Sequence, residues 1–170
     1  MPKPKIRARL ITLAAAAALI VADQLIKRWM DWALTISPGG PSRTLVPGVV
    51  GLHYMENTGI SFSLFGESKI VMGVISAVTA LVMLAGIVAL LLGKIGGAAP
   101  LCSAALILAG GLGNLIDRLY HGFVVDYIEL LFMNFAIFNF ADICITCGVV
   151  LMAGWVIWGE TRKRKTAVRH

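Results

Sequence analysis

The chain has 170 residues, of which 58% are hydrophobic and only 14% are charged. This composition excludes an ordinary soluble domain and indicates a membrane protein. A formal net charge of +6 can indicate nucleic acid binding, but basic residues that flank apolar segments serve membrane topology instead, so we expect no nucleic acid partner.

Four apolar segments come close to the length of about 20 residues that an α-helix needs to cross a bilayer. They cover approximately residues 10–30, 70–92, 98–116 and 139–158. The start of the chain is similar to a secretory signal peptide, but apolar residues continue to Leu34, so we expect an uncleaved span. We therefore predict an all-α polytopic membrane protein with four transmembrane helices in a single domain, residues 1–170.

The Lys and Arg residues indicate which way the spans run, because short basic loops stay on the cytoplasmic side. The first nine residues hold four of them, the turn between the second and third spans holds Lys94, and the tail after Glu160 holds five. Of the nine acidic residues, only Glu160 lies on that side. We therefore expect both termini in the cytoplasm and two outer segments, about 31–69 and 117–138, at the extracytoplasmic face.

Both outer segments contain strand-forming sequence. Residues 49–55 alternate two sets of side chains after the turn signal Pro47-Gly48, and residues 123–128 follow a His121-Gly122 turn. We expect a small extracytoplasmic β-sheet, with residues 57–65 as a platform or lid that clamps a substrate. Such backbone survives near lipid only where its polar groups are paired or wet.

Asp126 and Asp142 stand out because each lies among uncharged neighbours beside a predicted span. Ionisable groups at membrane depth are costly and usually functional. Asn139 can act as the N-cap of the fourth span, with Asp142 three residues later in the capping-box position. The helix dipole there favours an ionised carboxylate. The alternative is that Asp142 is merely a helix-start acid.

Asp126 lies in Val-Val-Asp-Tyr-Ile, where β-propensity disfavours aspartate and desolvation would raise the pKa of its carboxyl group. A strand acid that simply points to water is the alternative. If the two carboxyl groups approach each other, they cannot easily both ionise and would share a proton, as paired aspartates do in aspartic proteases. One would then activate water while the other donates a hydrogen bond to a substrate carbonyl.

Further polar residues lie at the same level of the spans. Asn114, Asp117 and Arg118 close the third span, and Asp23 and Lys27 lie one turn apart in the first. Local ion pairs, Asp23 with Lys27 and Asp117 with Arg118, are the alternative to a role in a site. Neither the three histidines nor the Cys-x-x-Cys of the fourth span forms a ligand set, so we expect no metal and no other cofactor.

Five short motifs resemble those of the bacterial lipoprotein signal peptidases, also called type II signal peptidases. They occur in that family's order and are Val21-Ala-Asp-Gln-Leu-Ile-Lys27, Glu56-Asn-Thr-Gly-Ile-Ser-Phe62, Gly110-Gly-Leu-Gly-Asn-Leu-Ile-Asp-Arg-Leu119, Gly122-Phe-Val-Val-Asp-Tyr127 and Phe138-Asn-Phe-Ala-Asp142. Two departures are visible. Ser61 stands where the family commonly has Ala, and Ile26 stands where Thr is usual.

The resemblance implies that Asp126 and Asp142 are the catalytic aspartates. A group of site-lining or substrate-binding residues is expected around them: Asn57, Gly59, Asn114, Arg118 and Asn139. A second group is expected to support the site structurally: Asp23, Lys27, Asp117 and Gly122.

We therefore predict an intramembrane aspartic endopeptidase of the bacterial inner membrane. It would remove the signal peptide from diacylglyceryl-modified prolipoproteins, on the amino side of the lipid-modified cysteine. The reaction type follows from the carboxylate pair, and the substrate follows only from the resemblance. Its partners would be the prolipoprotein and membrane lipid, and it would act as a monomer.

Two other functions compete with this prediction. One is a small ion- or proton-coupled transporter whose intramembrane acids relay ions. The clustering of the acids at one face, rather than along a path through the membrane, disfavours it. The other is a noncatalytic assembly factor, which would bind signal peptides without cleaving them.

Overall fold

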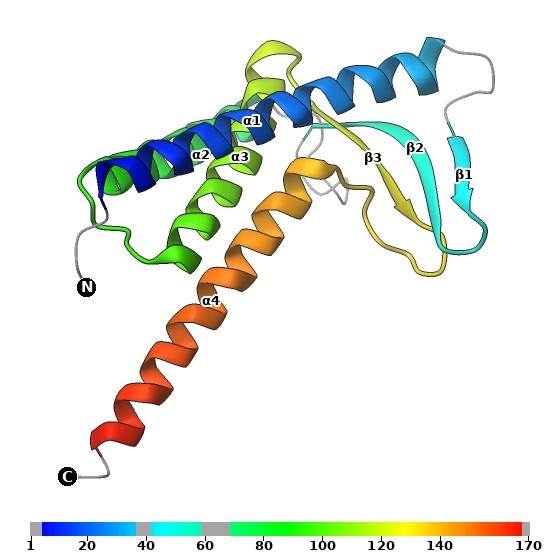
Figure 1. The fold of residues 1–170 in the computed structure, drawn as a ribbon. Coiled ribbons are helices and arrows are strands. Elements are labelled where there is room, and N and C mark those ends of the chain that lie inside the picture. Colours follow the sequence, from blue (N-terminus) through cyan, green and yellow to red (C-terminus); the bar gives the residue numbers. More distant parts are fainter. Residues whose placement is uncertain (1–4, 37–41, 59–68, 168–170) are drawn as a thin grey trace.

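The computed structural model describes residues 5–36, 42–58 and 69–167. Long helices form the body of the molecule, and a small sheet extends from one end of them (Figure 1). In chain order the elements are α1 (Ile6–Asp31), the π-helix η1 (Trp32–Ile36), β1 (Ser42–Val46), β2 (Val50–Asn57), α2 (Lys69–Leu91), α3 (Ala98–Tyr120), β3 (Val124–Leu130) and α4 (Phe140–Ala167).

Within the described residues, four helices are long and apolar enough to cross a membrane, which confirms the predicted fold class. The third helix continues to Tyr120 rather than ending near Ile116. Neither Pro nor Gly interrupts the sequence between Gly113 and Gly122, whose φ of +82° ends the helical path in a conformation that favours glycine. Asp117 and Arg118 therefore belong to the last turns of α3, in agreement with their predicted place at the close of the third span, and the outer segment begins after Tyr120 rather than at residue 117.

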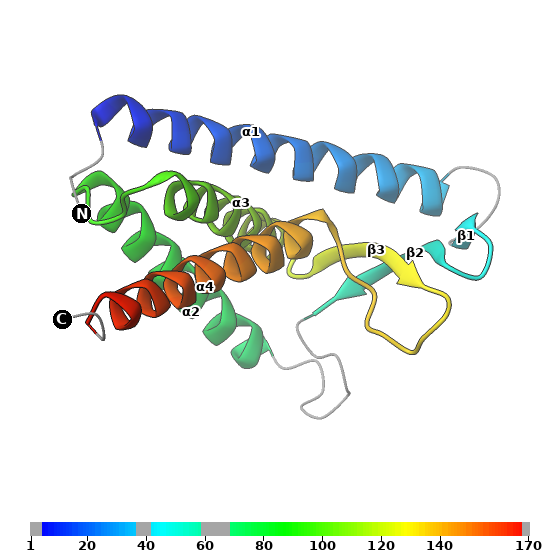
Figure 2. The same cartoon turned by 60° about the horizontal axis from the view of Figure 1, so that its bottom comes forward.

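α3 lies at the centre of the helices and packs against α1, α2 and α4 (Figure 2). Its glycines allow this close contact. A Cβ at Gly110 would collide with the backbone carbonyl of Ala141 in α4, and a Cβ at Gly113 would come within 2.6 Å of the Asp23 carboxylate. Small residues serve the same purpose between membrane helices in general. Elsewhere, apolar side chains of α2 are exposed, as contact with lipid requires: Val74, Val78 and Leu81.

The sheet is antiparallel, with the strand order β1-β2-β3. β2 and β3 confirm the two predicted strands. β1 was not predicted, because only turn signals mark that part of the sequence. Its register with β2 shifts between Thr44 and Val46, and an irregular strand of this kind leaves little periodicity to detect.

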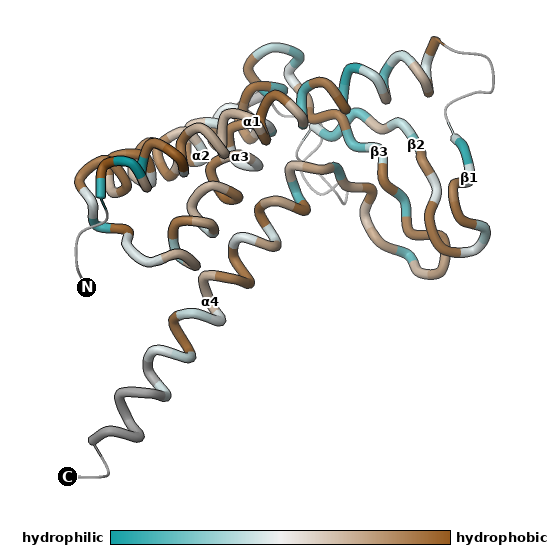
Figure 3. The backbone as a smooth tube through the Cα atoms, viewed as in Figure 1, coloured by the Kyte–Doolittle hydropathy of each residue, from teal (hydrophilic) through white to brown (hydrophobic). Residues whose placement is uncertain are grey.

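The register of the sheet decides which residues meet the helices. Met55 of β2 lies opposite Asp126 of β3, and Asn57 lies opposite Val124. After β3 the chain turns back, and Phe138 forms a bridge with Ile128, so that α4 begins beside β3. Most of the helical chain is apolar, and hydrophilic residues gather where α1 approaches β3 (Figure 3).

Replacing Gly110 tests the close approach of α3 and α4. In Gly110→Ala the new methyl group would meet the Ala141 carbonyl, which belongs to rigid backbone. We expect a loss of about 1–3 kcal/mol of stability from overpacking, measured as a lower unfolding temperature in detergent. Gly154→Ala is the matched control, because nothing lies within 4 Å of a Cβ there. Equal destabilisation of both variants would contradict the packing proposed for Gly110.

Candidate active site

Asp126 lies in the middle of β3 and is only 1% exposed. Both of its carboxyl oxygens accept hydrogen bonds from neutral amides. Asn57 Nδ2 donates to Oδ2 over 2.7 Å, and Asn139 Nδ2 donates to Oδ1 over 2.6 Å. The side chain therefore points into the protein, and the alternative of a strand acid that faces water is wrong.

Asp142 lies in the first turn of α4. Asn139 Oδ1 accepts from the Asp142 backbone N–H over 3.0 Å, and Asp142 Oδ2 accepts from the Asn139 backbone N–H over 3.1 Å. This reciprocal pattern confirms the predicted capping box. The other oxygen of Asp142 accepts from Asn114 Nδ2 of α3 over 2.8 Å. Asp142 is therefore more than a helix-start acid, since it also holds a side chain of a neighbouring helix.

Asn139 joins the two carboxyl groups. It is fully buried, its side chain donates to Asp126, and its backbone donates to Asp142. Asp126 and Asp142 also line the same cavity of about 460 Å³, together with Asn57, Phe138 and Thr146. Two consecutive elements, β3 and α4, thus bring both predicted carboxylates to one cavity.

Burial raises the pKa of the Asp126 carboxyl group to about 6. The nearby Asp142 carboxylate acts in the same direction, while the amide donors of Asn57 and Asn139 and the charge of Lys27 oppose it. Desolvation is the largest of these causes. Asp126 therefore holds a proton far more readily than an exposed aspartate, as a carboxyl group that shares a proton with a neighbour requires.

Lys27 is the centre of a buried charged cluster, which Asn114 links to the Asp142 carboxylate. The Lys27 ammonium is 3% exposed and contacts Asp23 Oδ2 at 2.9 Å and Asp117 Oδ2 at 2.8 Å. It also donates to Asn114 Oδ1 over 2.9 Å. The expected Asp23–Lys27 pair is therefore present but is not merely local, because Lys27 ties α1 to two residues of α3. Asp117 forms its ion pair with Lys27 and, in addition, accepts the backbone N–H of Val125 in β3.

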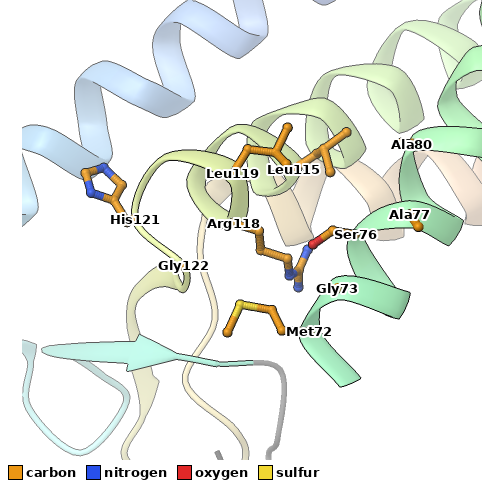
Figure 4. Close-up of a pocket in the computed structure, with 10 residues that line it drawn as sticks. All are labelled: Met72, Gly73, Ser76, Ala77, Ala80, Leu115, Arg118, Leu119, His121 and Gly122. Carbon is orange, nitrogen blue, oxygen red and sulfur yellow. The ribbon is translucent and has the colours of Figure 1, made fainter. Parts of the chain in front are cut away.

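Among the described residues, Arg118 is not one of those that line the cavity of about 460 Å³ beside the carboxylates. It lines a second cavity of about 690 Å³ between α2 and α3, whose other walls are mostly apolar. Its side chain extends toward Met72 and Ser76 of α2 (Figure 4). The guanidinium nevertheless interacts electrostatically with Asp142 and Asp126. Its Nε atom is buried and has no hydrogen-bond partner among the described residues.

Of the remaining predicted site residues, the structure describes Gly122 but not Gly59. Gly122 provides the positive φ between α3 and β3. Gly59 lies outside the described residues, as does most of the predicted lid. In the part of the chain that the structure describes, no three His, Cys, Asp or Glu side chains form a candidate metal site. The expectation of no metal or other cofactor stays a prediction.

Two residues at the site, Gln24 and Tyr127, belong to the five motifs, but no role was predicted for them. Gln24 Nε2 donates to Asp117 Oδ1 over 2.8 Å and so helps to hold the charged cluster. Tyr127 is 3% exposed, and its hydroxyl oxygen accepts the backbone N–H of Phe140 at the start of α4. A polar residue in an apolar span was the signal for Gln24. No comparable signal marks Tyr127, because tyrosine is common in strands.

The chain is similar to known proteins in both sequence and fold. Residues 15–158 match the family model described as signal peptidase (SPase) II. A lipoprotein signal peptidase of Streptococcus pneumoniae is 38% identical, over 85% of this chain and 90% of that protein. One of Streptococcus agalactiae is 37% identical, over 84% of this chain and 88% of that protein.

Two solved bacterial membrane enzymes, both studied by the in meso method, share the fold. One has a TM-score of 0.76 and 24% identity, with coverage of 90% of this chain and 91% of that one. The other has a TM-score of 0.70 and 26% identity, with coverage of 86% and 92%. The arrangement of helices and sheet is therefore shared over nearly the full length of all three chains.

The raised pKa of Asp126 predicts how stability depends on pH. Its value rises from 3.8 to about 6 on folding, so the folded protein binds this proton more tightly than the unfolded chain. The free-energy cost of burying the ionised Asp126 carboxylate is fully present well above pH 6. It decreases as the pH falls through 6 toward 3.8, because the carboxyl group becomes protonated. Relative to Asp126→Asn, the wild type should gain about 2.4 kcal/mol of stability between pH 7 and pH 4. Thermal unfolding in detergent measures this, and a difference that does not change with pH would contradict it.

Proposed function

Because the chain belongs to the signal peptidase II family, we propose that it is an aspartic endopeptidase that releases signal peptides from prolipoproteins. The bond cut would be the one on the amino side of a cysteine that carries a diacylglyceryl group. The observation that carries the aspartic mechanism is the joint hydrogen bonding of Asp126 and Asp142 by Asn139, at one cavity.

In this mechanism the ionised carboxylate accepts a proton from water as the water oxygen attacks the scissile carbonyl carbon. The protonated carboxyl group donates its proton to the carbonyl oxygen, which gives a neutral tetrahedral intermediate. When this intermediate collapses, one of its hydroxyl groups returns a proton to the carboxylate that had donated one, the C–N bond breaks, and the leaving nitrogen takes the proton that came from water. The pair returns to its starting state of one shared proton, and neither metal nor covalent intermediate is needed.

The roles of the two carboxyl groups follow from their surroundings. Asp126 lies in a strand, and burial raises its pKa to about 6, which favours it as the protonated partner. Asp142 lies at the positive end of a helix dipole, which favours it as the base. Strongly coupled acids titrate together, so the apparent pKa values of activity belong to the pair.

The second cavity suits the lipid part of such a substrate. It is large, mostly apolar and formed by two membrane helices, and Arg118 connects it electrostatically with the carboxylates. A diacylglyceryl group that arrives laterally from the bilayer can lie there while the peptide bond reaches Asp126 and Asp142. The peptide backbone would lie in the first cavity, with Asn57 as a polar contact, while Asn114 acts through its hydrogen bond to Asp142.

The same proposal sets the orientation in the membrane. Basic residues at both termini and at Lys94 favour the cytoplasm for that end of the helices. The sheet and the carboxylates then lie at the extracytoplasmic face of the inner membrane, where precursors become accessible and water is available. We propose that the enzyme acts there as a monomer, with lipid as its surroundings.

Removing either carboxylate should abolish cleavage. We expect Asp126→Asn and Asp142→Asn each to lower kcat about 10³-fold, measured with purified protein and a lipid-modified precursor. Glu129→Gln is the matched control, since it neutralises an acid of the same strand whose partner is His53 at 3.6 Å. It should retain activity within about twofold. Wild-type turnover by either aspartate variant would end the aspartic mechanism, and binding without cleavage by the wild type would support the noncatalytic alternative.

Filling the second cavity should weaken substrate binding. Gly73 lines this cavity and has nothing within 4 Å of a Cβ, so Gly73→Leu adds volume there without a clash. We expect the KM for a lipid-modified precursor to rise about tenfold, with little change in kcat, because loss of uniform binding has that signature. Gly154→Leu adds the same volume at an open position of α4 and should leave KM unchanged. An unchanged KM for Gly73→Leu would contradict the lipid site.

A further inference from the structure

The buried Lys27 ammonium uses all its hydrogen-bond donors. Two of them contact carboxylates, Asp23 and Asp117, at 2.9 and 2.8 Å. The third goes to the Asn114 amide oxygen at 2.9 Å. Charge neutrality does not require this last contact, because Lys27 already faces two acids. It is the only one of the three that leads toward the carboxylates of the cavity.

The contact decides which way the Asn114 amide points. Asn114 Oδ1 accepts from Lys27 and from Asn139 Nδ2, the latter over 3.2 Å. Its NH₂ group therefore faces Asp142 Oδ1 at 2.8 Å. If the amide turned over, its NH₂ group would face the ammonium and its oxygen would face the Asp142 carboxylate. Hydrogen bonds to charged groups are worth about 1.5–3 kcal/mol each, so the observed orientation is strongly favoured.

We propose that Lys27 is a positioning residue of the peptidase: its ammonium fixes the Asn114 amide, and the amide holds the Asp142 carboxylate toward the shared cavity. This inference rests on the proposed function, because it assigns a task in that reaction to a residue that touches neither substrate nor water. It also goes beyond structural support. Lys27 could hold the helices together through Asp23 and Asp117 alone. Its third hydrogen bond connects it, through Asn114, to the Asp142 carboxylate.

Lys27 also contributes charge to the pair, since its ammonium lowers the pKa of Asp126. Other charged or titratable groups line the same cavity of about 240 Å³ as Lys27: Arg28, Asp31, Tyr54, Tyr120 and His121. Arg118 adds a second cation near the carboxylates. These groups stay in place when Lys27 alone is altered, so a change in the pH profile would report the loss of the ammonium.

A suitable variant must remove the ammonium without leaving excess buried charge. Lys27→Met alone would strand two buried carboxylates, which is strongly destabilising. Lys27→Met combined with Asp23→Asn removes one charge of each sign. Asp117 then keeps its bonds from Gln24 and from the Val125 backbone. Asp23→Asn alone is the matched control, because an amide oxygen can still accept from Lys27 and the ammonium still holds Asn114.

The test compares these proteins in detergent with a lipid-modified precursor, over a pH series. We expect the double variant to lose about 10- to 100-fold in kcat with KM within twofold, and the control to lose no more than about threefold. Because the ammonium lowers the pKa of Asp126, the protonated partner, the alkaline limb of the double variant's kcat/KM profile should move to higher pH. Wild-type kcat and pH profile in the double variant would overturn the inference, as would an equal loss in the control.

A second variant covers the case in which the double variant does not fold. Asn114→Asp is isosteric and keeps an acceptor for Lys27, but it replaces the donor that faces Asp142 with an oxygen. The new carboxyl group lies against Asp142, so we expect a lower unfolding temperature but a folded protein with at least a tenfold loss of kcat, and wild-type kcat would overturn the inference. Absence of cleavage by the wild type itself would instead refute the proposed peptidase, and this inference with it.

Discussion

The buried carboxyl group of Asp126 in β3 and the half-buried one of Asp142 at the start of α4 must each be stabilised without being neutralised by a cation. Here neutral amides do this. Asp126 accepts from Asn57 and Asn139, and Asp142 accepts from Asn114 and from the backbone at Asn139. The buried Lys27 ammonium is separated from the Asp142 carboxylate by Asn114. It pairs instead with Asp23 and Asp117. This separation leaves the pair able to exchange a proton, which a direct ion pair would prevent.

That arrangement depends on how closely the helix backbones approach. Gly110 allows the Ala141 carbonyl of α4 to rest against α3, and Gly113 makes room for Asp23 of α1. Asn114 follows directly after Gly113, so the contacts that bring the three helices together also place its amide between Lys27 and Asp142. The polar site and the apolar packing are therefore a single structural feature. A change that separates the helices would also separate the donors from the carboxylates.

Much of this was predictable because local patterns determine it. Long apolar runs predicted the spans, alternation predicted β2, a β-prone stretch after a turn predicted β3, and the spacing of Asn139 and Asp142 predicted the capping box. Contacts between distant residues were not predictable in this way. Lys27 meets Asn114 across 87 positions of sequence, and no periodicity encodes that contact. Arg118 shows the same limit, since its motif indicated a site residue but not the cavity its side chain enters.

Under the proposed function, the position of Arg118 explains how one small protein can handle a substrate with a peptide part and a lipid part. One cavity is bounded by the carboxylates and amide donors, and the other is an apolar space between α2 and α3. Arg118 lines the second and interacts electrostatically with the acids of the first. A cation there can hold a polar group at the junction of peptide and lipid while leaving both acids bonded to amides. The buried Nε atom, which has no partner among the described residues, is a donor that such a group could use.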